Sequence, residues 1–229
     1  MIKNLVLSSG SIIGISYLGC LQILEEQNLV KNIENILGCS VGALFGLYLS
    51  LGYNSNELSQ ILKKVNFDDM TNIEYNDIIN FTENLGLQDN LKIIKITEIM
   101  IKAKTKNPNI TFLELYNLTE KNFIVITTCL TDRKEAYFNY KLTPHFKVID
   151  AVRMSISIPF LFKPVKYNDK YYVDGAVVNS YPMEYFKDQM DQTLGILIHT
   201  MGSCNIKNIE DFSNKIYDYS KKNTLYLQI

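Results

Sequence analysis

The pentapeptide Gly38-Cys39-Ser40-Val41-Gly42 lies between a short apolar run and a stretch whose apolar residues have helical spacing. A serine on a tight strand-to-helix turn needs small residues two positions away on each side, because a Cβ there collides with adjacent backbone. Gly38 and Gly42 meet that requirement. Such a turn sets the Ser40 hydroxyl at a helix N-terminus, where backbone N–H groups favour developing negative charge. Ser40 is therefore a candidate nucleophile on a nucleophile elbow, although an ordinary glycine-flanked helix start also fits the motif.

The amino terminus has the pattern of a strand, a small-residue loop and a helix. Residues 3–7 are apolar enough for a buried strand, residues 8–14 are mostly serine and glycine, and residues 15–29 have helical spacing. Such a loop exposes backbone N–H groups, and Gly10 and Ser11 are the candidates for holding an oxyanion. A phosphate-binding loop is the competing interpretation. It fits poorly, because the loop lacks a Gly-Lys-Ser/Thr ending and departs from Gly-x-Gly-x-x-Gly.

An aspartate followed by glycine interrupts the apolar, β-rich run of residues 171–179. The carboxylate of Asp174 is flanked by valines, so we expect it to be partly desolvated and a stronger base than a hydrated aspartate. A hairpin Asp-Gly turn is the alternative interpretation. That turn fits better at Asn168 and Asp169, between two short β-rich segments. Asp174 is therefore a candidate general base, with Gly175 as part of its motif.

Taken together, these three segments resemble the patatin-like phospholipase family. That family has a glycine-rich oxyanion loop after its first strand, then a Gly-x-Ser-x-Gly elbow, then a late Asp-Gly-Ala/Gly motif, and this chain has counterparts in the same order. The resemblance covers about residues 5–183. It implies an α/β fold, a three-layer α/β/α sandwich with a mostly parallel central sheet and a Ser nucleophile elbow. The expected organisation is a single domain over residues 1–229, with a lid or insert at residues 66–108.

The resemblance also implies a reaction, the hydrolysis of carboxylic ester bonds in phospholipids or lysophospholipids through an acyl-enzyme. Carried over residue by residue, Ser40 is the nucleophile, Asp174 is its base, and the amides around Gly10 and Ser11 hold the oxyanion. The glycines that support the three motifs are Gly14, Gly38, Gly42 and Gly175. The implied chemistry needs neither a metal nor another cofactor, and the sequence has no zinc-spaced cluster and no calcium loop.

The loop departs from the family pattern Gly-Gly-Gly-x-Lys/Arg-Gly. This chain has Ser9-Gly10-Ser11-Ile12-Ile13-Gly14, so two glycines are serines and Ile13 stands where the family has a basic residue. Serine keeps the backbone donor if its backbone reaches the required conformation. The missing cation leaves a second hypothesis open, a catalytically weak or silent lipid-binding relative.

The two histidines of the chain, His145 and His199, bear on the mechanism. The order Ser40, Asp174, His199 matches that of α/β-hydrolases, so a Ser-Asp-His esterase is a third hypothesis. The position of the elbow argues against it. Ser40 follows only the second expected strand, whereas an α/β-hydrolase builds several strands before its nucleophile. A Ser-Asp dyad is the prediction.

The composition is consistent with such an enzyme and argues against a nucleic-acid-binding protein. The chain has 229 residues, is 47% hydrophobic and carries a net charge of −1, so it can bury a sizeable core and has no basic field for nucleic acid. Its four cysteines lie singly, which fits reduced thiols in a cytoplasmic compartment. The apolar amino terminus resembles a signal peptide, but serines interrupt its apolar run, so we interpret it as the first strand and loop of the fold. The expected partner is a phospholipid or other acyl-lipid substrate, met by peripheral contact with a membrane.

Overall fold

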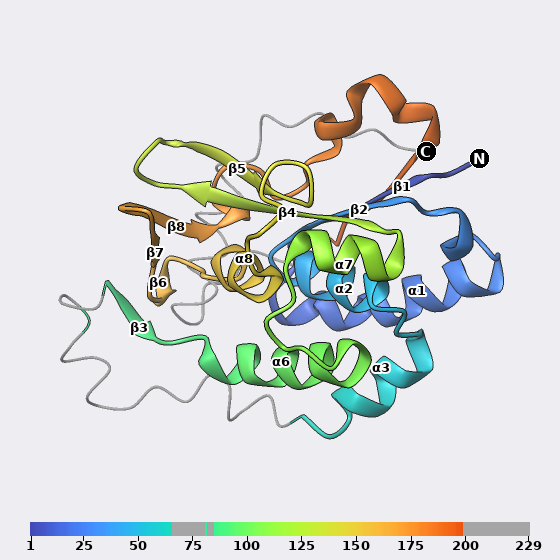
Figure 1. The fold of residues 1–229 in the computed structure, drawn as a ribbon, viewed down its shortest axis with the longest axis horizontal. Helices are drawn as coiled ribbons and strands as arrows, with labels where there is room; N and C mark the ends of the chain where they lie inside the picture. The colour runs from blue at the N-terminus through green and yellow to red at the C-terminus, as the bar shows by residue number, and fades with distance from the viewer. Residues whose placement is uncertain (66–80, 82–84, 199–229) are drawn as a thin grey trace, which may run out of the picture. The chain divides into compact units, whose positions relative to one another are not determined.

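A seven-stranded sheet runs through the unit Met1–Ile198 (Figure 1). The structure is a computed structural model, and it describes residues 1–65, 81 and 85–198. Residues 199–229 form a second unit that lies outside the described residues. The predicted single domain over residues 1–229 therefore stays a prediction.

Four neighbouring strands of the sheet are parallel, in the order β9-β1-β2-β4. Their bounds are Thr193–Ile196 for β9, Asn4–Leu7 for β1, Asn35–Cys39 for β2 and Asn122–Cys129 for β4. All of β1, and all of β2 and β4 except their first residues, is buried. Strands covered on both faces have near-continuous apolar sequences. This explains the apolar runs before the loop that follows β1 and before the elbow that follows β2.

Three antiparallel strands complete the sheet beside β4. They are β5 (Lys134–Phe138), β7 (Val165–Tyr167) and β8 (Lys170–Asp174). The two positive φ angles between β7 and β8, 46° at Asn168 and 58° at Asp169, are those of a two-residue type I′ turn. The hairpin turn predicted at these two residues is confirmed.

Strands β2 and β8 lie along the same edge of β4. Pairing with β2 ends at Cys39 opposite Ile126, and pairing with β8 begins at Asp174 opposite Thr127. Strand β5 overlaps both of these ladders, so it must occupy the other edge of β4. Because β2 is parallel to β4 and β8 is antiparallel, the carboxyl ends of β2 and β8 meet head to head on adjacent rungs.

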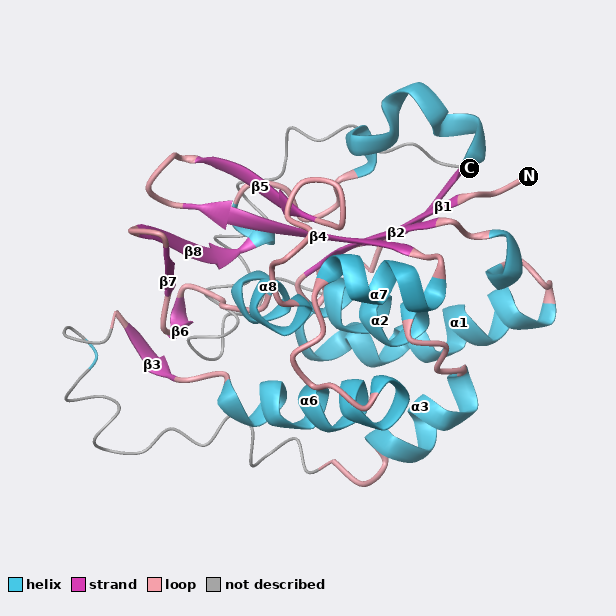
Figure 2. Cartoon of the chain, viewed as in Figure 1, coloured by secondary structure: helices cyan, strands magenta, loops and turns pink. Residues whose placement is uncertain are grey.

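The α-helices whose bounds fall within the described residues lie on one side of the sheet (Figure 2). They are α1 (Tyr17–Glu26), α2 (Val41–Ser50), α3 (Ser55–Leu62), α6 (Leu91–Thr105), α7 (Phe112–Thr119) and α8 (Val148–Ser155). The 3₁₀ helix η5 (Met183–Gln192) lies on the other side in Figure 1, and short 3₁₀ helices η1 (Ser11–Ser16), η2 (Val30–Asn32) and η4 (Gly175–Val177) occupy connections. The predicted α/β fold with a mostly parallel central sheet is confirmed.

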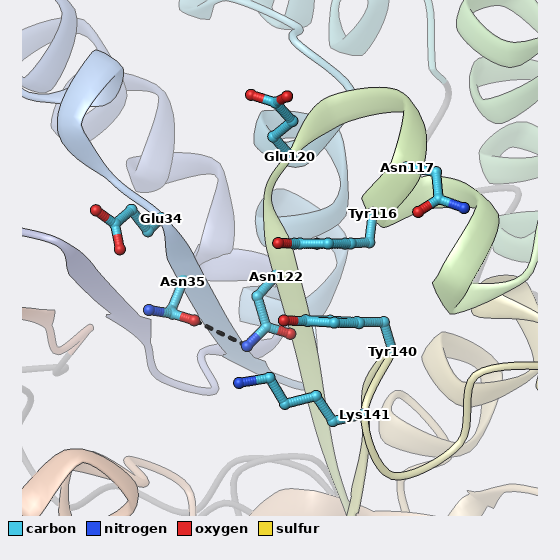
Figure 3. Close-up of a pocket in the computed structure, with 8 residues that line it drawn as sticks. All are labelled: Glu34, Asn35, Tyr116, Asn117, Glu120, Asn122, Tyr140 and Lys141. Carbon is cyan, nitrogen blue, oxygen red and sulfur yellow. Dashed lines mark hydrogen bonds between the residues drawn. The ribbon is translucent and has the colours of Figure 1, made fainter.

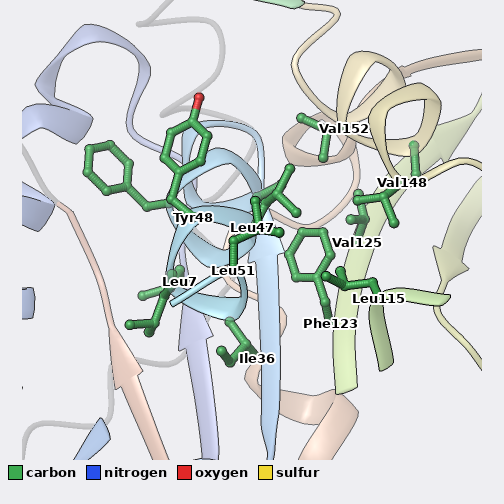
Figure 4. Packing of buried hydrophobic residues seen from close by; sticks show 14 of the residues in the cluster. Leu7, Ile36, Leu47, Tyr48, Leu51, Leu115, Phe123, Val125, Val148 and Val152 are labelled. Carbon is green, nitrogen blue, oxygen red and sulfur yellow. The ribbon is translucent and has the colours of Figure 1, made fainter. Parts of the chain in front are cut away.

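The main core fills the space between the sheet and α2, α7 and α8 (Figure 4). Phe123 and Val125 of β4 contribute from the sheet, and Leu47 from α2. Helix α2 is buried around most of its circumference, as expected of a helix that is apolar on all sides. Burial raises the pKa of its Tyr48 to about 12, and the hydroxyl pairs with Thr97 of α6 at 2.9 Å.

The range predicted as a lid, residues 66–108, is only partly described. Residues 66–80 and 82–84 lie outside the described residues. The remainder contains α6, which packs into the core, and β3 (Gly86–Gln88), which pairs with β6 (Phe160–Phe162) in a separate sheet. The lid stays a prediction. Among the helices that the structure describes, none combines the length and apolar character needed to cross a bilayer.

Candidate active site

Ser40 lies on the turn between β2 and α2, with φ 55° and ψ −123°. This is a strained conformation for a residue with a side chain. A Cβ on Gly38 would lie 2.4 Å from the carbonyl oxygen of Gly42, and one on Gly42 would lie 2.4 Å from that of Leu7. Backbone thus occupies the space where these two side chains would be, and the sequence meets the steric demand of a nucleophile elbow.

The Ser40 hydroxyl donates a hydrogen bond of 2.5 Å to Oδ2 of Asp174, 134 positions further along the chain. Both side chains are buried, with exposed fractions of 5% and 3%. The other carboxylate oxygen, Oδ1, accepts from the backbone N–H of Ala176 at 2.8 Å. Each oxygen of the carboxylate therefore has a donor, and one of these donors is the predicted nucleophile. The head-to-head ends of β2 and β8 bring the pair together.

The backbone around Asp174 is held from two sides. Its N–H donates to the carbonyl oxygen of Ser157 at 2.9 Å, and its carbonyl oxygen accepts from the hydroxyl of Thr128 at 2.9 Å. A Cβ on Gly175 would lie 2.5 Å from the carbonyl oxygen of Ile126. Close approach to β4 thus explains the glycine after the aspartate.

The loop that follows β1 carries the two predicted oxyanion donors. Its start is tied down by the hydroxyl of Tyr17, which donates to the carbonyl oxygen of Ser8 at 2.7 Å, and by Ser9 N–H, which donates to Ser180 at 2.8 Å. The N–H groups of Gly10 and Ser11 donate no hydrogen bond to another described residue.

The same loop packs on the first turn of α2. A Cβ on Gly14 would lie 2.2 Å from Cγ2 of Val41, the residue after Ser40, so the loop passes next to the elbow. Ser11 has a φ of 49°, which shows that a serine reaches the left-handed conformation here. Ile13, which stands at the basic position of the family pattern, is 41% exposed.

Ser155 contacts the elbow directly, and our sequence analysis did not identify it. Its hydroxyl oxygen accepts from the N–H of Ser40 at 2.9 Å, and the same hydroxyl donates to the carbonyl oxygen of Ile126 at 2.7 Å. The side chain is completely buried. No local spacing relates Ser155 to Ser40, because 115 positions separate them. The available signal was a small hydroxyl residue at the end of an amphipathic helix.

The histidines do not contribute to the described site. His145 is exposed in the turn before α8, whereas Ser155 is the last residue of that helix, about 12 Å further along its axis. His199 lies outside the described residues, so the triad hypothesis is untested. Within residues 1–65 and 85–198, no three His, Cys, Asp or Glu side chains gather in a way that could hold a metal ion.

A separate cavity of about 570 Å³ opens at the amino-terminal ends of β2 and β4, away from the elbow (Figure 3). Asn35 and Asn122, the first residues of β2 and β4, line it and are joined by a hydrogen bond of 2.8 Å. The rings of Tyr116 and Tyr140 stack in its wall with centroids 3.8 Å apart. Ser40 follows the other end of β2, so this cavity is not part of the candidate active site.

Comparison with known proteins identifies relatives of viral and bacterial origin. The chain is 33% identical over 221 residues to uncharacterized protein R571 of Acanthamoeba polyphaga mimivirus, covering 95% of this chain and 73% of R571. It is 33% identical over 184 residues to a protein of Invertebrate iridescent virus 6 named "Probable lipid hydrolase 463L", covering 80% of this chain and 62% of that protein. It is 26% identical over 212 residues to uncharacterized protein YqhO of Bacillus subtilis, covering 84% and 70%.

Two solved structures share the fold. VipD from Legionella pneumophila superposes with a TM-score of 0.63 at 20% identity, and the type III effector protein ExoU with 0.51 at 15%. The matches cover 85% and 94% of this chain but only 49% and 50% of those chains. The family model described as Patatin-like phospholipase matches residues 5–187, most of the chain. The chain therefore belongs to the patatin-like phospholipase family.

Proposed function

We propose that this chain is a lipid acyl hydrolase that cleaves carboxylic ester bonds of phospholipids with Ser40 as nucleophile and Asp174 as general base. The observation that carries the proposal is the buried 2.5 Å hydrogen bond from Ser40 Oγ to Asp174 Oδ2 on a strained elbow. A nucleophilic serine needs a base within hydrogen-bond reach, and this pair has that geometry. Family membership and the similarity to a viral protein named as a lipid hydrolase add support.

In the first half of the reaction, Oδ2 of Asp174 takes the hydroxyl proton while Ser40 Oγ bonds to the acyl carbonyl carbon. The carbonyl electron pair moves onto oxygen, and the N–H groups of Gly10 and Ser11 donate to the oxyanion. The carbonyl then re-forms as the bond to the lysolipid oxygen breaks. That departing oxygen takes the proton held by Asp174, and the acyl group remains on Ser40.

In the second half, water attacks the acyl-enzyme. Asp174 takes a proton from the water as its oxygen bonds to the acyl carbon, and the same N–H donors hold the second oxyanion. The bond to Ser40 Oγ then breaks, and the serine recovers its proton from Asp174. The fatty acid leaves, and the pair returns to its starting state. No metal or cofactor enters this proposal.

The substrate lies in a lipid aggregate, so we also propose peripheral contact with a membrane in a cytoplasmic compartment. Exposed apolar side chains occur on segments that adjoin the pair or the loop after β1. They are Ile13 and Ile15 in the loop after β1, Val177 and Val178 after Asp174, and Leu197 after β9. Apolar residues exposed around an active site support contact with an apolar phase.

The proposal is tested by fatty-acid release from mixed phospholipid vesicles with EDTA present. We expect the native chain to release fatty acid, and we expect Ser40→Ala and Asp174→Asn each to lose about 1,000-fold or more, because nucleophile and base act as a unit. Activity that survives in Ser40→Ala would contradict the assignment.

Two further measurements separate the remaining hypotheses. His199→Ala is expected to keep native activity; its inactivation would favour a Ser-Asp-His esterase. A fluorophosphonate probe is expected to label Ser40 in the native chain and not in Ser40→Ala. Vesicle binding without fatty-acid release or labelling would favour the silent lipid-binding relative that Ile13 suggests.

A further inference from the structure

Residues 155–157, at the carboxyl end of α8, hold the backbone of both members of the pair. The hydroxyl oxygen of Ser155 accepts from Ser40 N–H at 2.9 Å, and the carbonyl oxygen of Ser157 accepts from Asp174 N–H at 2.9 Å. We infer that these three residues are a two-point clamp on the Ser40–Asp174 pair and that Ser155 is a positioning residue of the reaction. This inference rests on the function proposed above.

The N–H of Ser40 needs an acceptor that the elbow itself does not supply. Ser40 precedes the first turn of α2, where backbone N–H groups have no partner within the helix, and β2 ends one residue earlier. A buried N–H without an acceptor carries its full desolvation penalty. The hydroxyl of Ser155 removes that penalty while Ser40 keeps its φ of 55°.

The orientation of the Ser155 hydroxyl is fixed. Its proton goes to the carbonyl oxygen of Ile126 at 2.7 Å, which leaves a lone pair for the N–H of Ser40. Ile126 is the β4 residue opposite Cys39, on the rung next to that of Asp174. Ser155 therefore ties the elbow to the strand that also sets the position of the base.

The other point of the clamp is anchored through Asn90, at the start of α6. The Asn90 amide donates to Ser157 Oγ at 3.0 Å and to the carbonyl oxygen of Arg153 at 3.1 Å, and its exposed fraction is 3%. Ser157 Oγ–H donates to the same carbonyl oxygen at 2.7 Å. Displacement of residues 155–157 would therefore shift the nucleophile relative to its base, and small misalignments of reacting groups are costly to rate.

The experiment compares Ser155→Ala and Ser155→Cys with the native chain and with Ser50→Ala. Alanine nearly preserves the volume of serine but removes the acceptor, whereas cysteine is larger and is a weak acceptor, so the two variants together separate packing from hydrogen bonding. Ser50 is a matched control, because it is 2% exposed and its hydroxyl donates to Gly46 within α2, away from the pair. Measured quantities are kcat and KM for fatty-acid release, the rate of fluorophosphonate labelling of Ser40, and the thermal unfolding midpoint.

We expect both Ser155 variants to lose about 10- to 100-fold in kcat and in labelling rate with KM within about twofold, and Ser50→Ala to keep the native kcat. The fluorophosphonate labels Ser40 only in folded protein. If Ser155→Ala folds poorly, the labelling rate of Ser155→Cys still tests the inference. Native kcat in Ser155→Cys, or an equal loss in Ser50→Ala, would overturn the inference. An inactive, unlabelled native chain would instead overturn the proposed function.

Discussion

Gly14 and Val41 meet where the loop after β1 crosses the first turn of α2. In Gly14→Ala the new Cβ would lie 2.2 Å from Cγ2 of Val41, so it would clash with a side chain and not with backbone. We expect this variant to lower the free energy of unfolding by about 1–3 kcal/mol, as overpacking does. Adding Val41→Ala removes both γ carbons and should recover most of the loss, measured by denaturant unfolding in a double-mutant cycle.

The control for this cycle is Gly19→Ala in α1, where a new Cβ would meet nothing within 4 Å. It should raise the free energy of unfolding by about 0.5–1 kcal/mol through helix propensity alone. Strictly additive effects of Gly14→Ala and Val41→Ala would contradict the contact between loop and elbow.

Individual residues of the site differ in how far the sequence reveals them. Gly38 and Gly42 were predictable, because their spacing on either side of Ser40 is a local pattern, although a Cβ on Gly42 would clash with the distant Leu7. Asp174 was predictable as a carboxylate within an apolar run, but its distance from Ser40 was not. Ser155 was missed, because its hydroxyl acts on backbone groups 115 and 29 positions away. Hydrogen bonds between distant segments leave no local pattern.

Helix α3 begins with a reciprocal pair of hydrogen bonds, and the one accepted by the Glu57 carboxylate depends on pH. Asn54 Oδ1 accepts from Glu57 N–H at 2.8 Å, and Glu57 Oε2 accepts from Asn54 N–H at 2.9 Å. The backbone bond from Asn54, and then Lys104, lower the pKa of Glu57 from its ordinary value of 4.5. Because the charged form is favoured in the fold, its stabilisation is present above pH 4.5 and is lost as the pH falls through the lowered pKa.

We therefore expect the thermal unfolding midpoint of the native chain to fall more steeply as the pH drops below about 5 than that of Glu57→Gln, which cannot titrate. The difference should be small, because the Glu57 side chain is 41% exposed and solvent screens its interactions. Parallel curves would show that this carboxylate does not contribute to the acid dependence of stability.

At the level of elements, turns and single strands were more predictable than their pairing. The type I′ turn at Asn168 and Asp169 follows from residue types that tolerate positive φ. The end-to-end meeting of β8 with β2 along β4 does not, because strand order depends on pairings that close long loops. Strand β8, which carries Asp174, could have paired with either edge of β4. It pairs with the edge that β2 also uses, because β5 occupies the other edge.

Across the whole unit, stability is expected to be uneven. The amides of β1, β2 and β4 lie in a buried parallel ladder, whereas β3 and β6 are joined at two rungs and Phe160 of β6 is 70% exposed. We expect hydrogen exchange, followed by mass spectrometry, to be slowest in the central strands and fast in β3 and β6. Equal protection of both sheets would show that the small sheet opens only together with the large one.

The meeting of β2 and β8 along β4 has a consequence for how such a protein can evolve. The separation of Ser40 and Asp174 is set by two adjacent rungs, opposite Ile126 and Thr127, and not by the 134 positions of chain between them. Insertions in the connecting segments of that interval, outside β4 and residues 155–157, can lengthen the protein without displacing the pair. Deletion of one residue within β8 would turn the aspartate to the opposite face. Natural variation should therefore accumulate in the connecting segments and be rejected in the ladder.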